Sequence, residues 1–437
     1  MNPLAEELNR TIQASSPYLF EMLSAEGKRF YYPSKGILSQ SAEAKQHAHA
    51  HNATIGVALR DGKAMYLPSV MDQLPGIDPD EALLYAPSYG DLELRKAWQT
   101  VTLHDNPDLA GKAVSLPVVT GGLSHGLSLI ADLVVDEGDL LLYPDKNWGN
   151  YALNFVQRKG AQPKLFPFLD GDHFNTNAFR QALAEIVASG RKKFVTLLNF
   201  PNNPTGYSPT EQECQDIADA LKEVADQGIN VVVIVDDAYY GLFFDAAVAR
   251  QSLFTKLAGL HPRILAFKAD AATKEVYVWG LRVGFVAFSI GGVKPGDPVF
   301  QALTDKMGGL VRAVVSNCSQ LSQHVVAKAL ENPAFYAERA ANVELIGKRA
   351  AKVKEVLSNP KYAEAWEVYP FNSGYFMCLK IKKVSAFDLR VHLLQKYGTG
   401  TIAINDTDLR IAFSSVEIEQ IPDLYELTFQ AWKDLVS

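Results

Sequence analysis

The stretch Asp270-Ala-Ala-Thr-Lys-Glu-Val-Tyr-Val-Trp-Gly-Leu-Arg-Val-Gly284 is the part of the chain around which the others are interpreted. It holds a lysine, Lys274, six residues before Gly280 and eight residues before Arg282. An apolar run, Val283-Gly-Phe-Val-Ala-Phe288, follows and is typical of a buried strand. An amine and a guanidinium are therefore expected at one end of a strand. There the arginine can bind a phosphate with two hydrogen bonds and favour the neutral form of the amine.

Two polar stretches upstream also follow apolar runs. Asn199-Phe-Pro-Asn-Asn-Pro-Thr-Gly206 comes directly after Phe194-Val-Thr-Leu-Leu198, and Asp236 comes after Val231-Val-Val-Ile-Val235. Such continuous apolar strands, alternating with helical segments, predict an α/β fold: a mostly parallel sheet with helices on both faces. Ligands bind beyond the carboxyl ends of the strands in such sheets, which is where these polar residues are expected.

The functional groups at these strand ends suit one cofactor. An amine, a carboxylate, a phenol, an amide and a guanidinium match the aldehyde, ring nitrogen, phenolic oxygen and phosphate of pyridoxal phosphate. In this interpretation Lys274 forms a Schiff base with the aldehyde, and Asp236 keeps the ring nitrogen protonated so that the ring accepts electrons. Asn203 and Tyr239 would both bond the phenolic oxygen.

Further predicted cofactor contacts come from a glycine turn and a tryptophan. Gly121-Gly-Leu-Ser124 precedes a helical segment, where backbone N–H groups and the helix dipole favour an anion. Trp148 is predicted either to lie flat on the pyridine ring or to belong to the core. Two residues compete for the central roles: Lys268 is an alternative to Lys274, and Asp237 is an alternative to Asp236.

Composition excludes several classes of protein. The 437 residues carry a net charge of -7 without a dense basic run, which argues against nucleic acid and anionic membranes as partners. Cys214, Cys318 and Cys378 lie far apart, so they form neither a disulfide framework nor a metal site. The N-terminus contains acidic residues and has no apolar signal core. We therefore expect a cytoplasmic protein without a bound metal.

The pattern of elements predicts three parts. Residues 66–328 hold the alternating strands and form a large cofactor-binding domain. Residues 329–437 form a smaller α+β domain, in which long helical stretches at 333–357 and 386–397 flank a strand. Residues 1–65 form an N-terminal segment that joins the smaller domain.

Taken together, these residues resemble the fold-type I pyridoxal-phosphate-dependent aminotransferases of class I/II, in particular the aspartate/aromatic group. The similarity runs in patches from about residue 55 to residue 413. It implies a homodimer with shared active sites that acts on an amino acid and a 2-oxo acid. It implies that Lys274, Asp236 and Tyr239 are catalytic. It further implies that the cofactor is bound by Gly122, Leu123, Ser124, Trp148, Asn203, Asp236, Tyr239, Thr273, Lys274, Arg282 and Tyr85.

The resemblance also implies a substrate site. Arg410 matches the arginine that binds the substrate α-carboxylate, and Arg312 resembles the arginine that crosses the dimer interface to a distal carboxylate. Asn203, Trp148 and Gly56 complete the predicted site. Aspartate and glutamate are the expected substrates, with aromatic amino acids as a further possibility. Alternatively, Arg312 lies on a solvated helix face or in an interface ion pair.

This sequence departs from the family at several positions. Ala271 stands where the family has a phosphate-binding serine, and Ala58 replaces a glycine of the substrate-contacting segment. Cys318 and Ser319 replace a pair of prolines. A β-lyase or decarboxylase on the same fold is one alternative function, and a pyridoxal-phosphate-binding module without activity is another.

Overall fold

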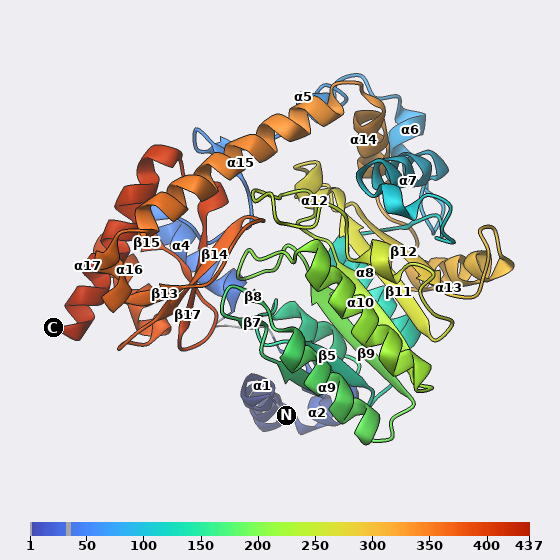
Figure 1. Ribbon diagram of the computed structural model, residues 1–437, viewed down its shortest axis with the longest axis horizontal. Coiled ribbons are helices and arrows are strands. Elements are labelled where there is room, and N and C mark those ends of the chain that lie inside the picture. Colours follow the sequence, from blue (N-terminus) through green and yellow to red (C-terminus); the bar gives the residue numbers. More distant parts are fainter. Residues whose placement is uncertain (1, 32–35) are drawn as a thin grey trace.

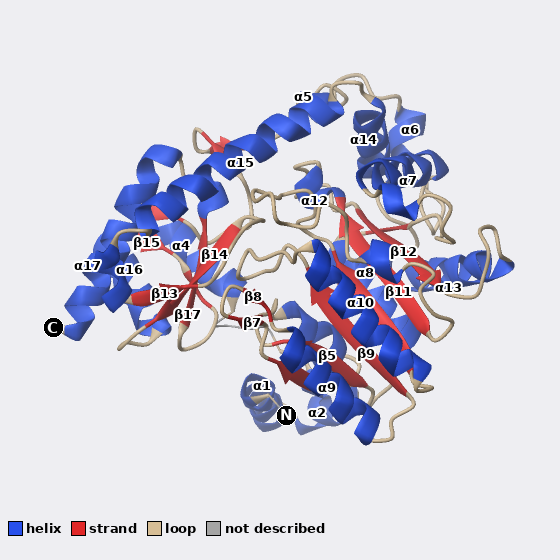
Figure 2. Ribbon diagram, viewed as in Figure 1, coloured by secondary structure: helices blue, strands red, loops and turns tan. Residues whose placement is uncertain are grey.

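The apolar runs of the sequence form a central sheet. The computed structural model describes residues 2–31 and 36–437; Met1 and residues 32–35, part of the predicted N-terminal segment 1–65, lie outside the described residues. Within the described residues this sheet has seven strands in the order β4-β12-β11-β10-β9-β5-β6 (Figures 1 and 2). The strands are β4 (Val118–Thr120), β5 (Leu140–Pro144), β6 (Gln162–Phe166), β9 (Lys193–Asn199), β10 (Asn230–Asp236), β11 (Ile264–Ala271) and β12 (Gly284–Ile290). Only β12 runs antiparallel to its neighbours in this sheet, which confirms the predicted mostly parallel α/β fold.

Alternate residues of β10 pack into two different apolar clusters. Val232 and Ile234 belong to the cluster beneath α8 (Leu123–Val134). Val231, Val233 and Val235 belong to the cluster that includes α9 (Thr176–Ala188) and α10 (Glu211–Asp226). Helices therefore cover both faces of the sheet, which explains why the strand is apolar without alternation (Figure 1).

Helix α10 begins where the sequence predicts it. The Thr210 hydroxyl accepts a hydrogen bond from the Glu213 N–H, and the Glu213 carboxylate accepts one from the Thr210 N–H. These two bonds make a capping box. The helix stops before Gly228, whose φ of 88° is a left-handed conformation that glycine adopts without steric cost.

The C-terminal part combines helices with a second, antiparallel sheet. Its sheet has the strand order β13-β14-β17-β16. The strands are β13 (Trp366–Val368), β14 (Phe376–Ile381), β17 (Asp408–Ala412) and β16 (Ile402–Ala403). Helix α16 (Ala386–Tyr397) packs on β16 and β17. Helix α17 (Ile421–Val436) packs on α16 and on α15 (Phe335–Leu357), and its Phe429 meets Trp366 of β13. In Figure 1, α15 runs from the side of α14 (Gln320–Glu331) and α7 (Leu92–Asp105) to this second sheet. The exact division into domains at residues 65 and 328 stays a prediction.

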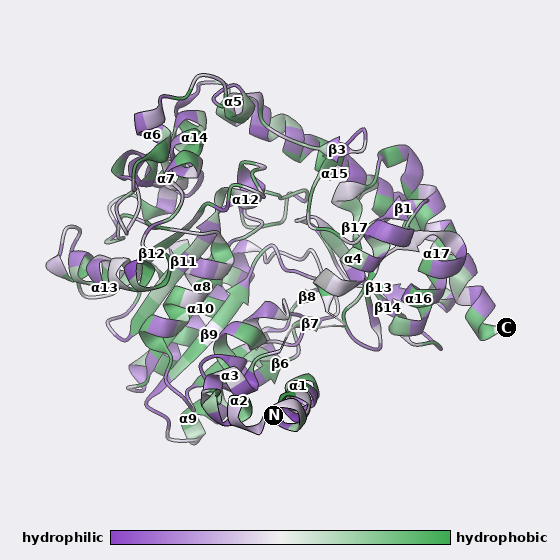
Figure 3. Cartoon of the chain, turned by 180° about the vertical axis from the view of Figure 1, so that it is seen from behind, coloured by the Kyte–Doolittle hydropathy of each residue, from purple (hydrophilic) through white to green (hydrophobic). Residues whose placement is uncertain are grey.

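The N-terminal segment contacts both parts (Figure 3). Arg29, at the end of α3 (Ala25–Arg29), donates a hydrogen bond to the Gln157 carbonyl beside the large sheet. Farther along, β1 (His51–Asn52) pairs in parallel with β15 (Thr399–Gly400) of the C-terminal part. No helix among the described residues is long and apolar enough to cross a membrane.

Candidate active site

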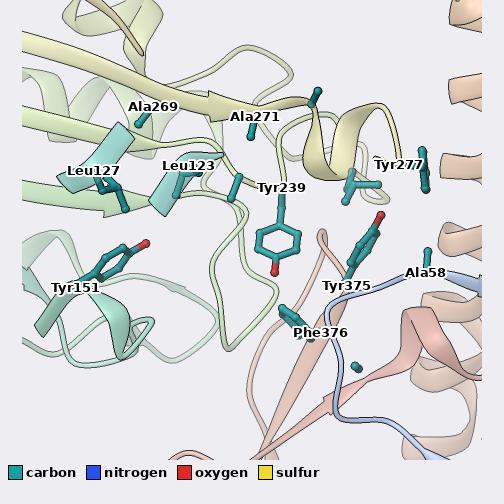
Figure 4. Close-up of a cluster of buried hydrophobic side chains, with 14 of the residues drawn as sticks. Ala58, Leu123, Leu127, Tyr151, Tyr239, Ala269, Ala271, Tyr277, Tyr375 and Phe376 are labelled. Carbon is teal, nitrogen blue, oxygen red and sulfur yellow. The ribbon is translucent and has the colours of Figure 1, made fainter. Parts of the chain in front are cut away.

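A cavity of about 270 Å³ opens beyond the carboxyl ends of β9, β10 and β11. Most residues predicted for the site line it. These are Gly56, Leu123, Ser124, Trp148, Asn203, Asp236, Tyr239, Thr273, Lys274, Arg282 and Arg410, and they are joined by Ile37, Tyr151, Asn199, Ala238, Ala271 and Phe376. In Figure 4 the Tyr239 hydroxyl points toward the ring of Phe376.

Asp236 is the last residue of β10, and its carboxylate is fully enclosed. Its Oδ1 accepts hydrogen bonds from the Ala238 N–H at 3.0 Å and from Asn199 Nδ2 at 3.2 Å. Its Oδ2 accepts one from the Tyr151 hydroxyl at 2.6 Å. Burial raises the pKa of Asp236 to about 6, while the bonds from Tyr151 and Ala238 and the charge of Lys274 oppose that rise. The result is an oriented carboxylate that can ionise at neutral pH.

Lys274 approaches the same cavity from the short helix α12 (Ala272–Glu275). Its Nζ lies 4.8 Å from the centre of the Tyr239 ring. Burial lowers the pKa of Lys274 to about 8, with Asp236 opposing the shift and Arg282 and Arg410 adding to it. Roughly a tenth of this amine is therefore neutral at pH 7, far more than for an ordinary lysine, and a nucleophilic or proton-accepting lysine requires the neutral form.

The alternative lysine and aspartate lie together on the other side of β10 and β11. Lys268 Nζ lies 3.0 Å from Asp237 Oδ2 and also contacts the Asp270 carboxylate. Burial alone would lower the pKa of Lys268, but Asp237, Asp270 and Glu275 raise it overall, so this lysine stays charged. Neither Lys268 nor Asp237 lines the cavity, which favours Lys274 and Asp236 for the chemistry.

One end of the cavity is suited to an anion. No side chain caps the N-terminus of α8, so the first N–H groups of that helix remain for a ligand. The Arg282 guanidinium packs directly over Gly122, because a Cβ at Gly122 would lie 2.3 Å from Arg282 Nη2. Ser124 and Thr273 add hydroxyls to the cavity wall, whereas Ala271 contributes only a methyl group.

Arg410, on β17, closes another side of the cavity and is 2% exposed. Its Nη1 donates to Asn203 Oδ1 at 2.8 Å, its Nη2 donates to the Thr54 carbonyl at 3.0 Å, and it lies 4.1 Å from the centre of the Phe376 ring. Its Nε has no hydrogen-bond partner, and no carboxylate of the described residues pairs with it. Burial lowers the pKa of Arg410 to about 10. A buried guanidinium without a counter-ion is suited to bind the carboxylate of a ligand.

Three predicted residues do not line the cavity. Gly122 touches Arg282 just outside it. Tyr85 is 90% exposed, and Arg312 is exposed near the end of α13 (Pro298–Val315), where its Nη1 donates to Ser316 Oγ at 2.6 Å. Because the last two roles require a second subunit, their assignment stays a prediction. Among the departures, Ala58 and Cys318 are buried away from the cavity.

Sequence reasoning overlooked several lining residues. Asn199 offered a signal, since it is a polar residue at the end of an otherwise apolar strand, β9. Tyr151 offered none, because it reaches Asp236 across 85 positions of the sequence. Ile37, at the start of α4 (Ile37–His47), and Phe376 belong to segments of the chain that only the fold brings to the cavity.

The cavity fits the predicted cofactor. An amine of lowered pKa, a buried carboxylate and a free phenol surround one space, and an uncapped helix with an arginine borders it. The Tyr239 hydroxyl makes no hydrogen bond to a described residue and faces the cavity. These groups match an aldehyde, a ring nitrogen, a phenolic oxygen and a phosphate.

Comparisons with known proteins identify a family. Residues 52–426 match the family described as aminotransferase class I and II. A probable aspartate/prephenate aminotransferase of Aquifex aeolicus is 29% identical over 250 residues, which cover 57% of each chain. An LL-diaminopimelate aminotransferase of Desulforudis audaxviator is 27% identical over 213 residues, 48% of each chain. The chain spans about half the length of these curated relatives it matches.

Solved structures share the fold over nearly the whole chain. An aminotransferase from Anaerococcus prevotii superposes with a TM-score of 0.82 at 24% identity, covering 94% of this chain and 99% of that one. A kynurenine aminotransferase of Pyrococcus horikoshii gives 0.78 at 15% identity, covering 96% and 98%. With the match of residues 52–426, the chain belongs to the aminotransferase class I and II family, whose members use pyridoxal phosphate.

Proposed function

We propose that this protein is an aminotransferase that moves an amino group between an amino acid and a 2-oxo acid. One observation carries the proposal: Lys274, Asp236 and Arg410 face the same cavity. An amine that can be neutral, a carboxylate and an arginine without a counter-ion are the groups needed to activate and hold an amino acid on pyridoxal phosphate. Lys274 would hold the cofactor through its aldehyde.

Different residues of the cavity would bind different parts of the cofactor. When bound, the cofactor supplies a ring that accepts the electron pair left at the substrate Cα. Asp236 would hold the ring nitrogen, while Tyr239 and Asn203 would hold the phenolic oxygen. Arg282, Ser124 and the first N–H groups of α8 would hold the phosphate.

Lys274 would move the proton of the substrate. Its neutral amine would take the proton from Cα as a general base, and its protonated form would then give a proton, as a general acid, to the carbon that carries the cofactor's aldehyde. The lowered pKa of Lys274, about 8, keeps both forms accessible near neutral pH. Arg410 would orient Cα by binding the α-carboxylate with the Nη and Nε groups that face it.

A homodimer would supply the missing parts of the site. Apolar side chains on α6 (Pro79–Leu83), the loop after it and the end of α13 are strongly exposed in the single chain: Leu83 at 79%, Leu84 at 61%, Val314 at 54% and Val315 at 49%. A two-fold interface over these two segments would cover these apolar side chains. Tyr85 and Arg312 belong to the same two segments, so two-fold pairing would bring them to the partner's cavity.

We propose aspartate and glutamate as substrates, with 2-oxoglutarate as an amino acceptor, because a second arginine would bind their distal carboxylate. We propose aromatic amino acids as a second class of substrate, because Phe376, Trp148 and Ile37 give the cavity apolar walls. The buried, unpaired Cys214, Cys318 and Cys378 support a reducing compartment such as the cytoplasm.

The test measures kcat/KM for aspartate, glutamate, phenylalanine and alanine by the 2-oxo acid formed. Arg312→Ala should lower the value for the two dicarboxylates about 100-fold or more and leave phenylalanine and alanine nearly unchanged. Arg180→Ala, an exposed arginine on α9 that pairs with Glu223, is the matched control and should change nothing. Equal losses on all four substrates would remove the distal-carboxylate role. A wild type that forms no 2-oxo acid from any amino acid would refute the aminotransferase itself.

A further inference from the structure

The Asp236 carboxylate is held by donors from three parts of the fold. Ala238 and Asn199 donate to Oδ1, from the loop after β10 and from the end of β9. Among the residues that the structure describes, Tyr151 is the sole hydrogen-bond donor to Oδ2, at 2.6 Å. Tyr151 is 1% exposed, and its hydroxyl has no other hydrogen-bond partner among the described residues.

The backbone around Tyr151 holds its ring in one orientation. Tyr151 directly precedes η2 (Ala152–Gln157), a π-helical turn of a kind that is often found at functional sites. Its N–H donates to the Trp148 carbonyl at 3.0 Å. Its ring meets Trp148 edge-on at 5.7 Å and Tyr143 edge-on at 6.5 Å. One short segment therefore places Trp148 at the cavity wall and aims the Tyr151 hydroxyl at Asp236.

A short bond from a neutral hydroxyl to a buried carboxylate favours the ionised form of that carboxylate. The charged and titratable groups that face Asp236 are Tyr151, Lys274 of α12, Asp237 and Tyr239. Lys274 also favours the ionised form, but it loses that effect whenever its amine is neutral. Asp237 opposes it. Among these titratable neighbours, Tyr151 is thus the one whose support does not depend on the protonation of the lysine.

We propose that Tyr151 is a positioning residue that keeps the Asp236 carboxylate ionised and aimed into the cavity while Lys274 exchanges its proton. The hydrogen bond stands on the geometry alone, whereas its use toward the cofactor ring rests on the proposed function. Its removal should leave the cavity intact but favour the neutral acid, which is the wrong partner for a protonated ring nitrogen.

The first test follows Asp236 itself in the full-length, cofactor-free chain. Its carboxyl pKa is read by NMR after 13C labelling of aspartate, with the signal assigned by its loss in Asp236→Asn. Tyr151→Phe should raise this pKa by about one to two units, the size expected for a hydrogen bond to a charged group. Tyr143→Phe is the matched control, because it removes a buried hydroxyl of the same aromatic cluster that does not touch Asp236.

Cofactor affinity gives a second readout. The pH below which pyridoxal phosphate binding weakens should rise by the same amount in Tyr151→Phe and stay unchanged in Tyr143→Phe. Placement of 3-fluorotyrosine at position 151 keeps the shape of the ring and strengthens the hydrogen-bond donor. It should therefore lower both the Asp236 pKa and the pH below which cofactor binding weakens, even where Tyr151→Phe folds poorly.

An Asp236 pKa that Tyr151→Phe and 3-fluorotyrosine both leave unchanged would overturn the proposal. Failure of the proposed function looks different. If the wild-type protein moves no amino group, Tyr151→Phe would still raise the Asp236 pKa measured by NMR. The two failures are therefore distinguishable.

Discussion

Two lysines six residues apart, Lys268 and Lys274, acquire opposite chemistry from their surroundings. Lys268 is surrounded by carboxylates and stays charged, whereas Lys274 has two arginines among its charged neighbours and a pKa of about 8. The offset of Arg282 favours Lys274 in the sequence, but the structure shows what decides the choice. Lys268 lies on β11, whereas Lys274 lies on the short helix α12 that follows this strand. The strand and the helix place the two amines on different sides of the sheet.

Borohydride reduction of the protein with bound cofactor should attach the cofactor to Lys274, as peptide mapping would show. Lys274→Ala should retain weak cofactor binding and lose turnover. Lys268→Met is the control: it leaves two buried carboxylates unpaired, so it should cost about 3–5 kcal/mol of stability without changing the attachment site. A reduced cofactor found on Lys268 would contradict the assignment.

Asp236 should also make the stability of the cofactor-free protein depend on pH. Its pKa is about 6 in the folded chain and about 3.9 in an unfolded one, so the folded state binds the extra proton between these values. The resulting stability is complete below about pH 4 and is lost as pH rises through 6, a change of about 3 kcal/mol. Urea unfolding of wild type and Asp236→Asn from pH 4 to 7 should show this difference. A difference that does not vary with pH would contradict the raised pKa.

For single residues, the sequence predicted which functional groups the site contains, but not which residues they contact. Asp236 and Asp237 could not be separated by composition, because both follow the same apolar run. The structure separates them: Asp236 faces Tyr151 and the cavity, and Asp237 faces Lys268 and Ser252. Tyr151 itself could not be predicted, since nothing near it in the sequence indicates a contact with a distant strand.

Among the elements, the loop Asn199–Gly206 joins the large sheet to the C-terminal part. The Gly206 carbonyl accepts hydrogen bonds from the N–H groups of Asn372 and Ser373 at 2.9 and 3.0 Å. A Cβ at Gly206 would lie 2.0 Å from the Phe376 carbonyl oxygen. The loop can approach β14 this closely only because residue 206 is glycine.

Gly206→Ala should therefore destabilise the protein far more than Gly228→Ala. Both glycines have positive φ, 78° and 88°, but a Cβ at Gly228 would meet nothing within 4 Å. Gly228→Ala should cost about 1 kcal/mol from backbone strain alone, whereas Gly206→Ala adds a backbone clash and should cost at least about 3 kcal/mol. Urea denaturation measures both, and equal losses would show that the junction is not tightly packed.

Elements with strong local signals were predicted well. The capping box of α10 and the apolar strands β9 and β10 are fixed by neighbouring residues, so their positions follow from the sequence. The π-helical turn η2 was not predicted, because the sequence Ala152–Gln157 carries no local signal that separates it from an ordinary helix.

At the scale of the whole molecule, the fold class follows from the order of strands and helices, but the complete site does not. Tyr85 and Arg312 lie on the outer surface of the single chain. Local sequence patterns carry no information about what a second copy would bring to the cavity. Their roles therefore need a measurement on the assembly.

Mixed dimers test the shared site directly. A preparation of Lys274→Ala chains and one of Arg312→Ala chains should each lack activity toward aspartate. Unfolding and refolding the two together, or expressing them together, should restore activity, because a mixed dimer has one cavity with its own Lys274 and its partner's intact Arg312. Absence of recovery in mixed dimers isolated by two affinity tags would place Arg312 outside the partner's site.

The central claim is that this chain transfers an amino group by means of Lys274. The direct measurement incubates the protein and pyridoxal phosphate with 15N-labelled amino acids and 13C-labelled 2-oxo acids and identifies the products by mass spectrometry. The account predicts new amino acids that carry both labels, in amounts equal to the 2-oxo acids released, and none with Lys274→Ala. Release of the 15N as free ammonia, or of an amine together with carbon dioxide, would contradict it and indicate a lyase or a decarboxylase.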